Sequence, residues 1–157
     1  MATTPNGDID TTETECTSPE LSDGNSHWFH IRSKDNANNF CEIVHYGPFL
    51  IDRTPPLQGQ LIINNGDKYT QYVDVVLQVS AVDEGAGVGQ VKFSNNKAEW
   101  STPVDYSETA LIDWQLLPGT GDREVCMRLS DKVGNWNTEP FCSKSKLIWT
   151  HPLMLQI

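Results

Sequence analysis

The chain has 157 residues, with 21 Asp and Glu against 11 Lys and Arg, and a formal net charge of −10 at pH 7. This acidity argues against nucleic acid or an anionic membrane surface as a partner. No apolar run approaches the roughly 18 to 20 residues that cross a bilayer, so membrane insertion is not expected. The first residues carry no secretory signal, which leaves open a cytosolic protein or a fragment of a longer chain.

Residues 1–26 are rich in Thr, Ser, Asp, Glu, Asn and Gly. They hold too few apolar side chains to offset the entropy cost of folding, so we expect a polar, largely disordered arm or the remnant of a preceding domain. Apolar and polar residues then alternate, which predicts a strand at 29–32, and a turn-rich segment leads to a second strand at 41–45. Residues 27–51 are therefore expected to form a hairpin.

A pair of prolines, Pro55 and Pro56, follows the expected hairpin. Each proline fixes φ and lacks a backbone donor, so residues 52–56 are expected to form a stiff linker, with Pro55 and Pro56 in a structural role. Beyond the linker the apolar pattern has no helical period. Short strands are expected at 61–63, 73–80, 88–93, 103–106, 111–116, 125–130 and 141–149. About seven strands at intervals of roughly ten residues are typical of an antiparallel, immunoglobulin-like (Ig-like) β-sandwich, here over 57–150, followed by a tail at 151–157.

Residues 29–40 align without gaps with residues 125–136, 96 positions later. Both segments carry alternating apolar residues, an Arg, an Asp and an Asn at matching positions, and each closes on an aromatic residue, Phe40 or Trp136. This match indicates a tandem array, in which 27–51 is the C-terminal hairpin of a truncated copy and 57–150 is a complete copy. Phe40 and Trp136 are accordingly assigned a structural role in closing the two turns.

The sequence contains the segments YGPFLIDRTPP at 46–56, INNG at 63–66, YT at 69–70, VSAVDEGAGV at 79–88, FSNN at 93–96 and WS at 100–101, besides the hairpins at 34–40 and 131–136. Together these segments resemble the tandem bacterial Ig-like (fibronectin-III-like) repeats of secreted and cell-surface proteins. The resemblance implies an all-β sandwich that acts as a non-catalytic spacer or scaffold in an extracellular or cell-surface protein, next to other Ig-like domains of the same chain. The sequence departs from the family at Asn38, where Gly is usual, and in its cysteines, which such repeats generally lack.

Residue spacings typical of catalysis are missing from the sequence. There is no nucleophile elbow, no Gly-rich phosphate loop, no His-Glu-x-x-His and no paired-carboxylate motif. His27 and His30 are three positions apart, so in a strand they face opposite sides and cannot chelate one metal ion from a single face. The protein is therefore expected not to be an enzyme, with no catalytic residues and no cofactor apart from a calcium ion at the site considered next.

Four acidic residues lie in turns or connectors: Asp83 and Glu84 at a glycine-rich strand end, Asp52 in the linker and Asp131 in a hairpin. Hard oxygen ligands gathered at one pole of a sandwich could hold calcium at a domain boundary. The same residue types also start turns, because their side chains accept hydrogen bonds from the backbone two residues on. We favour this turn role over the calcium site.

The tryptophan side chains are expected to pack in the core or at its edge, since each Trp buries on the order of 200 Å². Trp100 is set among polar residues, and with Tyr106 and the loop 83–88 it forms the expected contact surface of the alternative function. That alternative is a recognition module for a glycan or a partner protein. It predicts an exposed aromatic patch of a few hundred Å².

The four cysteines fit no zinc pattern, because no two have the C-x2-4-C spacing. If 131–137 is a hairpin turn, a register that sets Phe141 opposite Met127, both inward, also sets Cys142 opposite Cys126, both outward. Facing Cβ atoms lie about 4.5 to 5.5 Å apart, within reach of a disulfide in a twisted pair. Cys16 and Cys41 are a second candidate pair, whereas a cytosolic home would leave all four as thiols.

Overall fold

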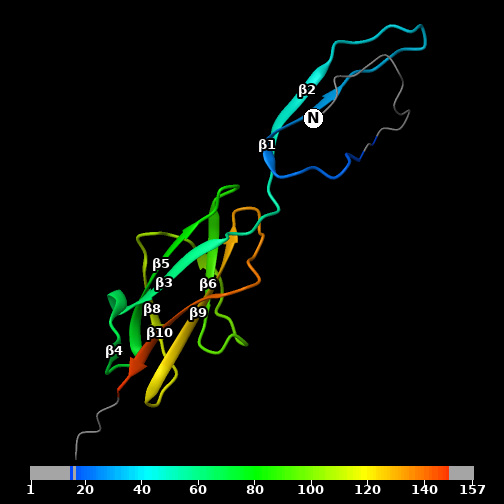
Figure 1. The fold of residues 1–157 in the computed structure, drawn as a ribbon. Helices are drawn as coiled ribbons and strands as arrows, with labels where there is room; N and C mark the ends of the chain where they lie inside the picture. The colour runs from blue at the N-terminus through cyan, green and yellow to red at the C-terminus, as the bar shows by residue number, and fades with distance from the viewer. Residues whose placement is uncertain (1–14, 16, 149–157) are drawn as a thin grey trace, which may run out of the picture. The chain divides into compact units, whose positions relative to one another are not determined.

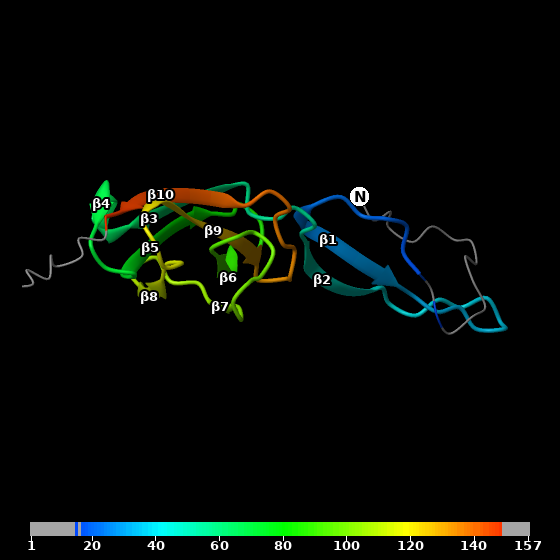
Figure 2. The ribbon, with the colours of Figure 1, turned by 90° about the horizontal axis from the view of Figure 1, so that it is seen from below.

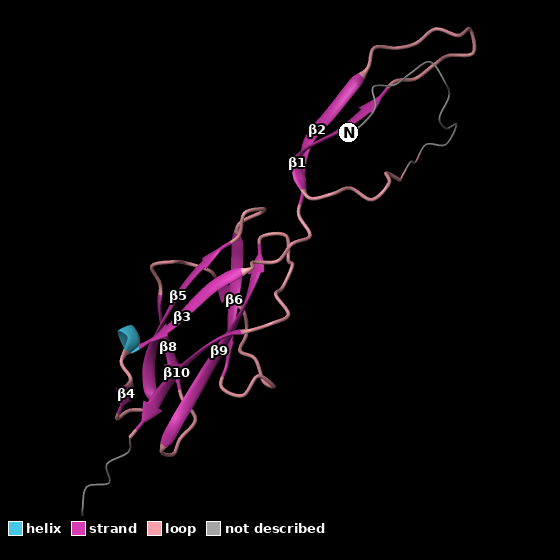
Figure 3. Cartoon of the chain, in the orientation of Figure 1, coloured by secondary structure: helices cyan, strands magenta, loops and turns pink. Residues whose placement is uncertain are grey.

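The structure, a computed structural model, describes residue 15 and residues 17–148. It divides the chain into a first unit, Met1–Arg53, and a second unit, Thr54–Ile157. In the described part every regular element is a β-strand apart from one short 3-10 turn, so the predicted all-β class is confirmed (Figure 3). Within this part of the chain no helix is long and apolar enough to cross a membrane. Cys16 and the predicted tail 151–157 lie outside the described residues.

The first unit is a two-stranded antiparallel ribbon of β1 (Gly24–Ile31) and β2 (Val44–Ile51) (Figure 1). The predicted second strand, 41–45, is wrong in position, because β2 starts at Val44 and continues through Pro48 to Ile51. A two-stranded ribbon leaves one side of each strand unpaired, and a proline there removes no ladder hydrogen bond.

The end of the predicted disordered arm is ordered. β1 begins at Gly24, inside the segment assigned to the arm. Glu20 and Asp23 both form ion pairs with Arg53, so the described part of the arm closes on the end of the ribbon. The amino-acid composition does not predict this ordered segment, because its contacts are between charged side chains and need no apolar surface.

No further strand covers the ribbon among the described residues of the first unit. Its aromatic side chains are therefore accessible: Trp28 is 41% exposed, Phe49 48% and Tyr46 56%. Trp28, which like the other tryptophans was expected to pack in the core or at its edge, is therefore partly exposed. The ribbon presents apolar surface that the second layer of a sandwich would normally bury.

The second unit has two facing sheets (Figure 2). A five-stranded sheet has the order β4-β10-β9-β6-β7, and a three-stranded sheet has the order β3-β5-β8. All neighbours are antiparallel except β10 and β4, which are parallel. The elements are β3 (Gln58–Ile63), η1 (Asn64–Gly66), β4 (Tyr69–Thr70), β5 (Asp74–Val82), β6 (Val88–Ser94), β7 (Val104–Asp105), β8 (Leu111–Gln115), β9 (Gly121–Asp131) and β10 (Phe141–Leu147).

The core lies between the two sheets and follows the alternation in the sequence. Over 75–79 of β5 and 125–129 of β9, every second residue is a buried apolar side chain, because neighbouring side chains of a strand point to opposite faces. Strand β3 passes so close to the other sheet that a Cβ on Gly59 would lie 2.8 Å from the Leu129 side chain. Pro56 is also buried and belongs to the second unit, so the predicted linker 52–56 ends inside folded structure. The buried residues of the two strands are Val75, Leu77, Val79, Val125, Met127 and Leu129.

The chain enters and leaves the second unit at opposite poles (Figure 1). It enters ahead of β3, which runs away from the connector to η1 and β4 at the far end. The end of β10 lies beside β4: Leu147 pairs with Thr70, and the Ile148 N–H donates to the Thr70 carbonyl oxygen at 2.8 Å. The two ends of the unit are thus separated by the length of β3.

Gly89 lies at an irregularity in the β6–β9 pairing, and its replacement should destabilise the sandwich. A Cβ at this position would lie 2.4 Å from the backbone oxygen of Asp131. β6 and β9 are both central strands of the sheet, so a shift of either would disrupt its pairing with its other neighbour. We therefore expect Gly89→Ala to lower the free energy of unfolding by about 2 to 3 kcal/mol. Urea denaturation measures this change, and Gln90→Ala, at an exposed neighbour, is the control. Equal stability of the two variants would show that the contact is not tight.

Candidate functional site

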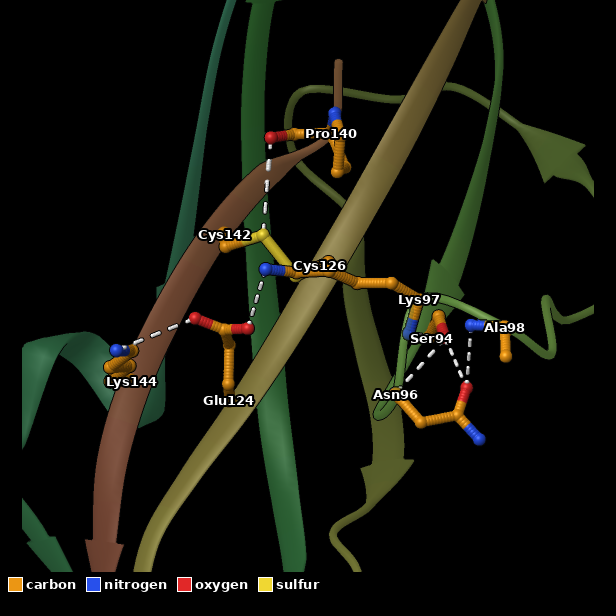
Figure 4. Close-up of polar contacts among 9 residues, drawn as sticks. All are labelled: Ser94, Asn96, Lys97, Ala98, Glu124, Cys126, Pro140, Cys142 and Lys144. Carbon is orange, nitrogen blue, oxygen red and sulfur yellow. Dashed lines mark hydrogen bonds and ion pairs between the residues drawn. A yellow bond between two sulfur atoms is a disulfide. The ribbon is translucent and has the colours of Figure 1, made fainter. Parts of the chain in front are cut away.

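Cys126 and Cys142 form a disulfide between β9 and β10, with an S–S distance of 2.08 Å and a Cα–Cα distance of 4.0 Å (Figure 4). Phe141 faces Met127 in the same ladder, which is the register expected from the hairpin. The two sulfurs differ in environment. Cys142 is exposed as expected, but Cys126, on the face away from the sandwich core, is only 1% exposed.

A charged cluster flanks the disulfide (Figure 4). Glu124 on β9 pairs with Lys97 at 2.8 Å and with Lys144 on β10 at 3.6 Å. The hydrogen bond from Lys97, aided by both positive charges, lowers the pKa of Glu124 below its usual range. Since both neighbouring sulfurs are in the disulfide, neither is a thiolate, and the cluster offers a metal ion only one carboxylate.

The loop that carries Lys97 is fixed by short-range hydrogen bonds. The Ser94 hydroxyl accepts from the Lys97 N–H at 2.8 Å, and the Asn96 side-chain oxygen accepts from the Ala98 N–H at 2.9 Å (Figure 4). The same Asn96 oxygen also accepts from the Glu99 N–H at 2.9 Å. Ser94 itself pairs with Cys126 across the β6–β9 ladder. The loop therefore lies beside the disulfide and holds Lys97 against Glu124, a tertiary contact that the sequence pattern did not predict.

Asp131 organises the β9–β10 turn. Its Oδ1 accepts hydrogen bonds from the N–H groups of Val133, Gly134 and Asn135 at 3.0, 2.7 and 2.8 Å. Its Oδ2 accepts from the Asn135 side chain at 2.6 Å. Asp131 is 2% exposed, so this carboxylate is buried and bonded by its own turn.

The turn between β1 and β2 has three of these four hydrogen bonds 96 positions earlier. Asp35 Oδ1 accepts from the N–H groups of Ala37 and Asn39 at 2.8 Å, and its Oδ2 accepts from the Asn39 side chain at 2.9 Å. Isolated bridges join Lys34 to Phe40 and Ser130 to Trp136 at the same offset. Asn38, with φ 73°, takes the left-handed conformation that Gly134 has in the second turn, so the departure from glycine is accommodated.

The structure places the four candidate calcium ligands as follows. An oxygen of Asp83 lies within 4.8 Å of an oxygen of Asp131, and Glu84 is exposed. Asp83 accepts a hydrogen bond from the Gly87 N–H at 2.7 Å, so both aspartates serve turns of their own. Asp52 belongs to the first unit. These bonds match the turn role, and the calcium site stays a prediction.

Trp100 and Tyr106 do not form one contact surface. Trp100 is half-buried, with the Arg128 guanidinium 4.9 Å from its ring centre, on the sheet face opposite the core. The Tyr106 ring packs against the core, and its hydroxyl accepts from the Ala81 N–H at 3.0 Å. Lys92 lies 4.3 Å from the Trp136 ring and 5.9 Å from the Trp100 ring. The indole rings of Trp100 and Trp136 thus already form cation–π contacts with basic side chains. These contacts join distant segments and could not be predicted from the sequence.

A shallow hollow of about 340 Å³ lies beside β5 and the loop before β8. Its lining offers one carboxylate, from Glu108, together with neutral polar and apolar groups. General acid-base catalysis needs at least one further titratable group within hydrogen-bond reach. The hollow therefore adds no catalytic candidate to the residues considered from the sequence.

Cys41 is the free cysteine among the residues that the structure describes, and it is exposed. It occupies the position of Asn137 in the matching turn. The Ser33 N–H donates to the Cys41 sulfur at 3.0 Å, as the Leu129 N–H donates to the Asn137 side-chain oxygen at 2.7 Å. Hydrogen bonds from the Ser33 side chain and backbone lower the pKa of the Cys41 thiol.

Cys41 should consequently react with iodoacetamide at a lower pH than an ordinary cysteine. The thiolate is the reactive form, and a lowered pKa raises its fraction at pH values below the usual pKa. We expect Ser33→Ala to move the curve of alkylation rate against pH to higher pH, measured by mass spectrometry with Cys16 replaced by serine. Thr102→Ala, far along the chain, is the control. A curve that coincides with that of an unstructured cysteine peptide would contradict the prediction.

The two facing sheets define the second unit as an Ig-like β-sandwich module. No protein-family model matches the sequence, and no curated protein matches it. Among solved structures, the PKD1 domain of Vibrio anguillarum Epp is similar at 12% sequence identity, over 63% of this chain and 100% of that chain, with a TM-score of 0.43. No functional conclusion rests on a likeness at this level.

Proposed function

We propose that the chain is a non-catalytic Ig-like spacer or scaffold module of an extracellular or cell-surface multidomain protein. The observation that carries this proposal is the placement of the two ends of the second unit at opposite poles, ahead of β3 and after β10. Modules built in this way extend a chain when they are joined end to end. A pull on the chain then acts along β3 and β10 and loads their ladders in shear.

The disulfide supports an extracellular setting. Such bonds persist in oxidising compartments and are rare in the cytosol. Cys126 and Cys142 join the final strand of the sandwich to its central neighbour, the position at which a pull on the end of the chain first acts. A covalent bond at this place suits a module that resists unfolding.

The proposal includes a tandem arrangement, in which the ribbon is the C-terminal hairpin of a second Ig-like repeat and neighbouring repeats are the partners. The matching turns support it, since Asp35 and Asp131 accept three equivalent hydrogen bonds. The exposed aromatic residues of the ribbon also support it, because in the second unit the core face of the matching hairpin is buried under the three-stranded sheet.

Force spectroscopy on the full chain, held at its two ends, tests the spacer role. We expect the second unit to unfold in one distinct force peak. The disulfide spans a sequence separation of 16, so reduction should add about 55 Å to the extension released, at roughly 3.3 to 3.6 Å per residue. A Cys126→Ala/Cys142→Ala variant should show the longer extension without reductant. A smooth extension without a peak would overturn the proposed mechanical role.

A further inference from the structure

Two histidines face each other across the ribbon of the first unit. His30 on β1 pairs directly with His45 on β2. Their Nδ1 atoms are 2.5 Å apart, and the ring centres are 4.7 Å apart at an interplanar angle of 78°. Each ring nitrogen can hold one hydrogen or one lone pair, so a single hydrogen lies between the two Nδ1 atoms. The pair lies at the surface, where ions have access.

This histidine pair occupies the position that the disulfide occupies in the second unit. In the ribbon Ile31 faces Val44, and the next position along is His30 opposite His45. In the β9–β10 hairpin Met127 faces Phe141, and the next position along is Cys126 opposite Cys142. The turns that close both ladders have matching Asp-centred hydrogen bonds. The same cross-strand position thus carries a covalent link in one unit and two imidazoles in the other.

We propose that His30 and His45 chelate a divalent transition-metal ion, with Zn²⁺ as the ion to test, which cross-links the ribbon where the disulfide cross-links the hairpin. Imidazole nitrogen is a favoured ligand of zinc, nickel and copper. On binding, the hydrogen between the Nδ1 atoms moves to the outward Nε2, and both Nδ1 lone pairs bind the ion. The inference does not depend on the spacer role.

The geometry needs only a small adjustment. Two Zn–N bonds of about 2.0 to 2.1 Å at a tetrahedral angle place the nitrogens roughly 3.3 Å apart. The observed separation of 2.5 Å therefore has to widen by less than about 1 Å, which rotation of two surface side chains supplies. Water completes the coordination. His27, the third histidine of the ribbon, bonds the Ser22 carbonyl oxygen at 2.8 Å and stands apart from this pair, which makes it the matched control.

The first test is Zn²⁺ titration of the untagged full chain by calorimetry, with Cys16 and Cys41 replaced by serine so that no free thiol competes. We expect one ion per chain. His30→Asn and His45→Asn should each abolish this binding, while His27→Asn retains it. Binding that survives both substitutions, or no binding at millimolar Zn²⁺, would overturn the proposal.

Hydrogen exchange supplies a local readout. With free Zn²⁺ at 100 times its dissociation constant, the open form of the ribbon is depleted about 100-fold, and exchange of the β1 and β2 amides should slow by the same factor. The β9 and β10 amides should not change. Equal slowing in the His30→Asn variant would contradict a cross-link at this pair.

A double variant tests the cross-strand position without metal. His30→Cys/His45→Cys should oxidise to a disulfide, as the matching residues of the second unit do. With Cys16 and Cys41 replaced by serine, the oxidised variant should be lighter than the fully reduced one by about 4 Da, against about 2 Da for the Cys126–Cys142 bond alone, because each disulfide costs two hydrogens. If both new thiols remain free under oxidising conditions, positions 30 and 45 do not face each other, and the proposed metal site is overturned.

Discussion

Removal of the disulfide by Cys126→Ala/Cys142→Ala is expected to lower the free energy of unfolding of the second unit by about 3 kcal/mol. The link closes a loop with a sequence separation of 16, and loop-closure entropy in the unfolded chain gives about this value for such a length. The melting temperature should fall on the order of 10 to 20 °C for a unit of this size. Scanning calorimetry of the full chain measures both quantities.

Two controls accompany this experiment. Reduction of the unsubstituted chain should reproduce the effect of the double variant, because both remove the same constraint. Cys41→Ala, at the exposed thiol of the first unit, should leave the transition of the second unit unchanged. A decrease in the free energy of unfolding below about 1 kcal/mol would show that residual structure already keeps β9 and β10 close in the unfolded chain. The loop-closure entropy could then not be the source of the stabilisation.

Asp131→Ala is expected to destabilise the second unit by about 3 kcal/mol. The substitution leaves the N–H groups of Val133, Gly134 and Asn135 without the acceptor that now organises the turn. Loss of a buried hydrogen-bond partner costs about 1 to 3 kcal/mol for each group, and part of this is regained from water. Urea denaturation followed by tryptophan fluorescence measures the change.

Asp131→Asn removes the negative charge but keeps the side-chain shape and one oxygen acceptor. It therefore separates the contribution of the charge from that of the side-chain shape. We expect this variant to lose about half as much stability as Asp131→Ala, because hydrogen bonds to an ionised group are roughly twice as strong. Asp35→Ala removes the matching carboxylate of the first unit and should not affect the second. If both Asp131 variants unfold like the unsubstituted chain, the turn is set by its backbone alone.

Much of the second unit could be predicted from alternation. The strict pattern around Val75, Leu77 and Val79 marks a strand with one buried face, and these three residues are buried on β5. The hairpin turn at Asp131 then fixes the register of two strands, which places Cys126 opposite Cys142. Local pattern and turn chemistry were sufficient here, because the interacting residues are close in sequence.

Contacts between distant segments could not be predicted in the same way. The parallel pairing of β4 with β10 involves two residues on each side and leaves no periodic trace. The burial of Cys126 and the contacts of Trp100 with Arg128 lie on the sheet face turned away from the core, which alternation would assign to solvent. The pairing of His30 with His45 could not be predicted, because the expected second strand, 41–45, begins three residues before β2 does and gives no register for the ribbon.

The unequal burial of the two disulfide sulfurs makes thiol exchange directional. A small thiol reaches the exposed Cys142 but not Cys126, which is 1% exposed, so attack should occur at one sulfur only. The mixed disulfide then forms on Cys142 and Cys126 departs as the leaving thiolate. Because Cys126 stays held opposite Cys142 in the ladder, it can attack back and expel the reagent. Brief exposure to a reductant would thus be self-repaired, while reagents that trap a thiol would capture the open form.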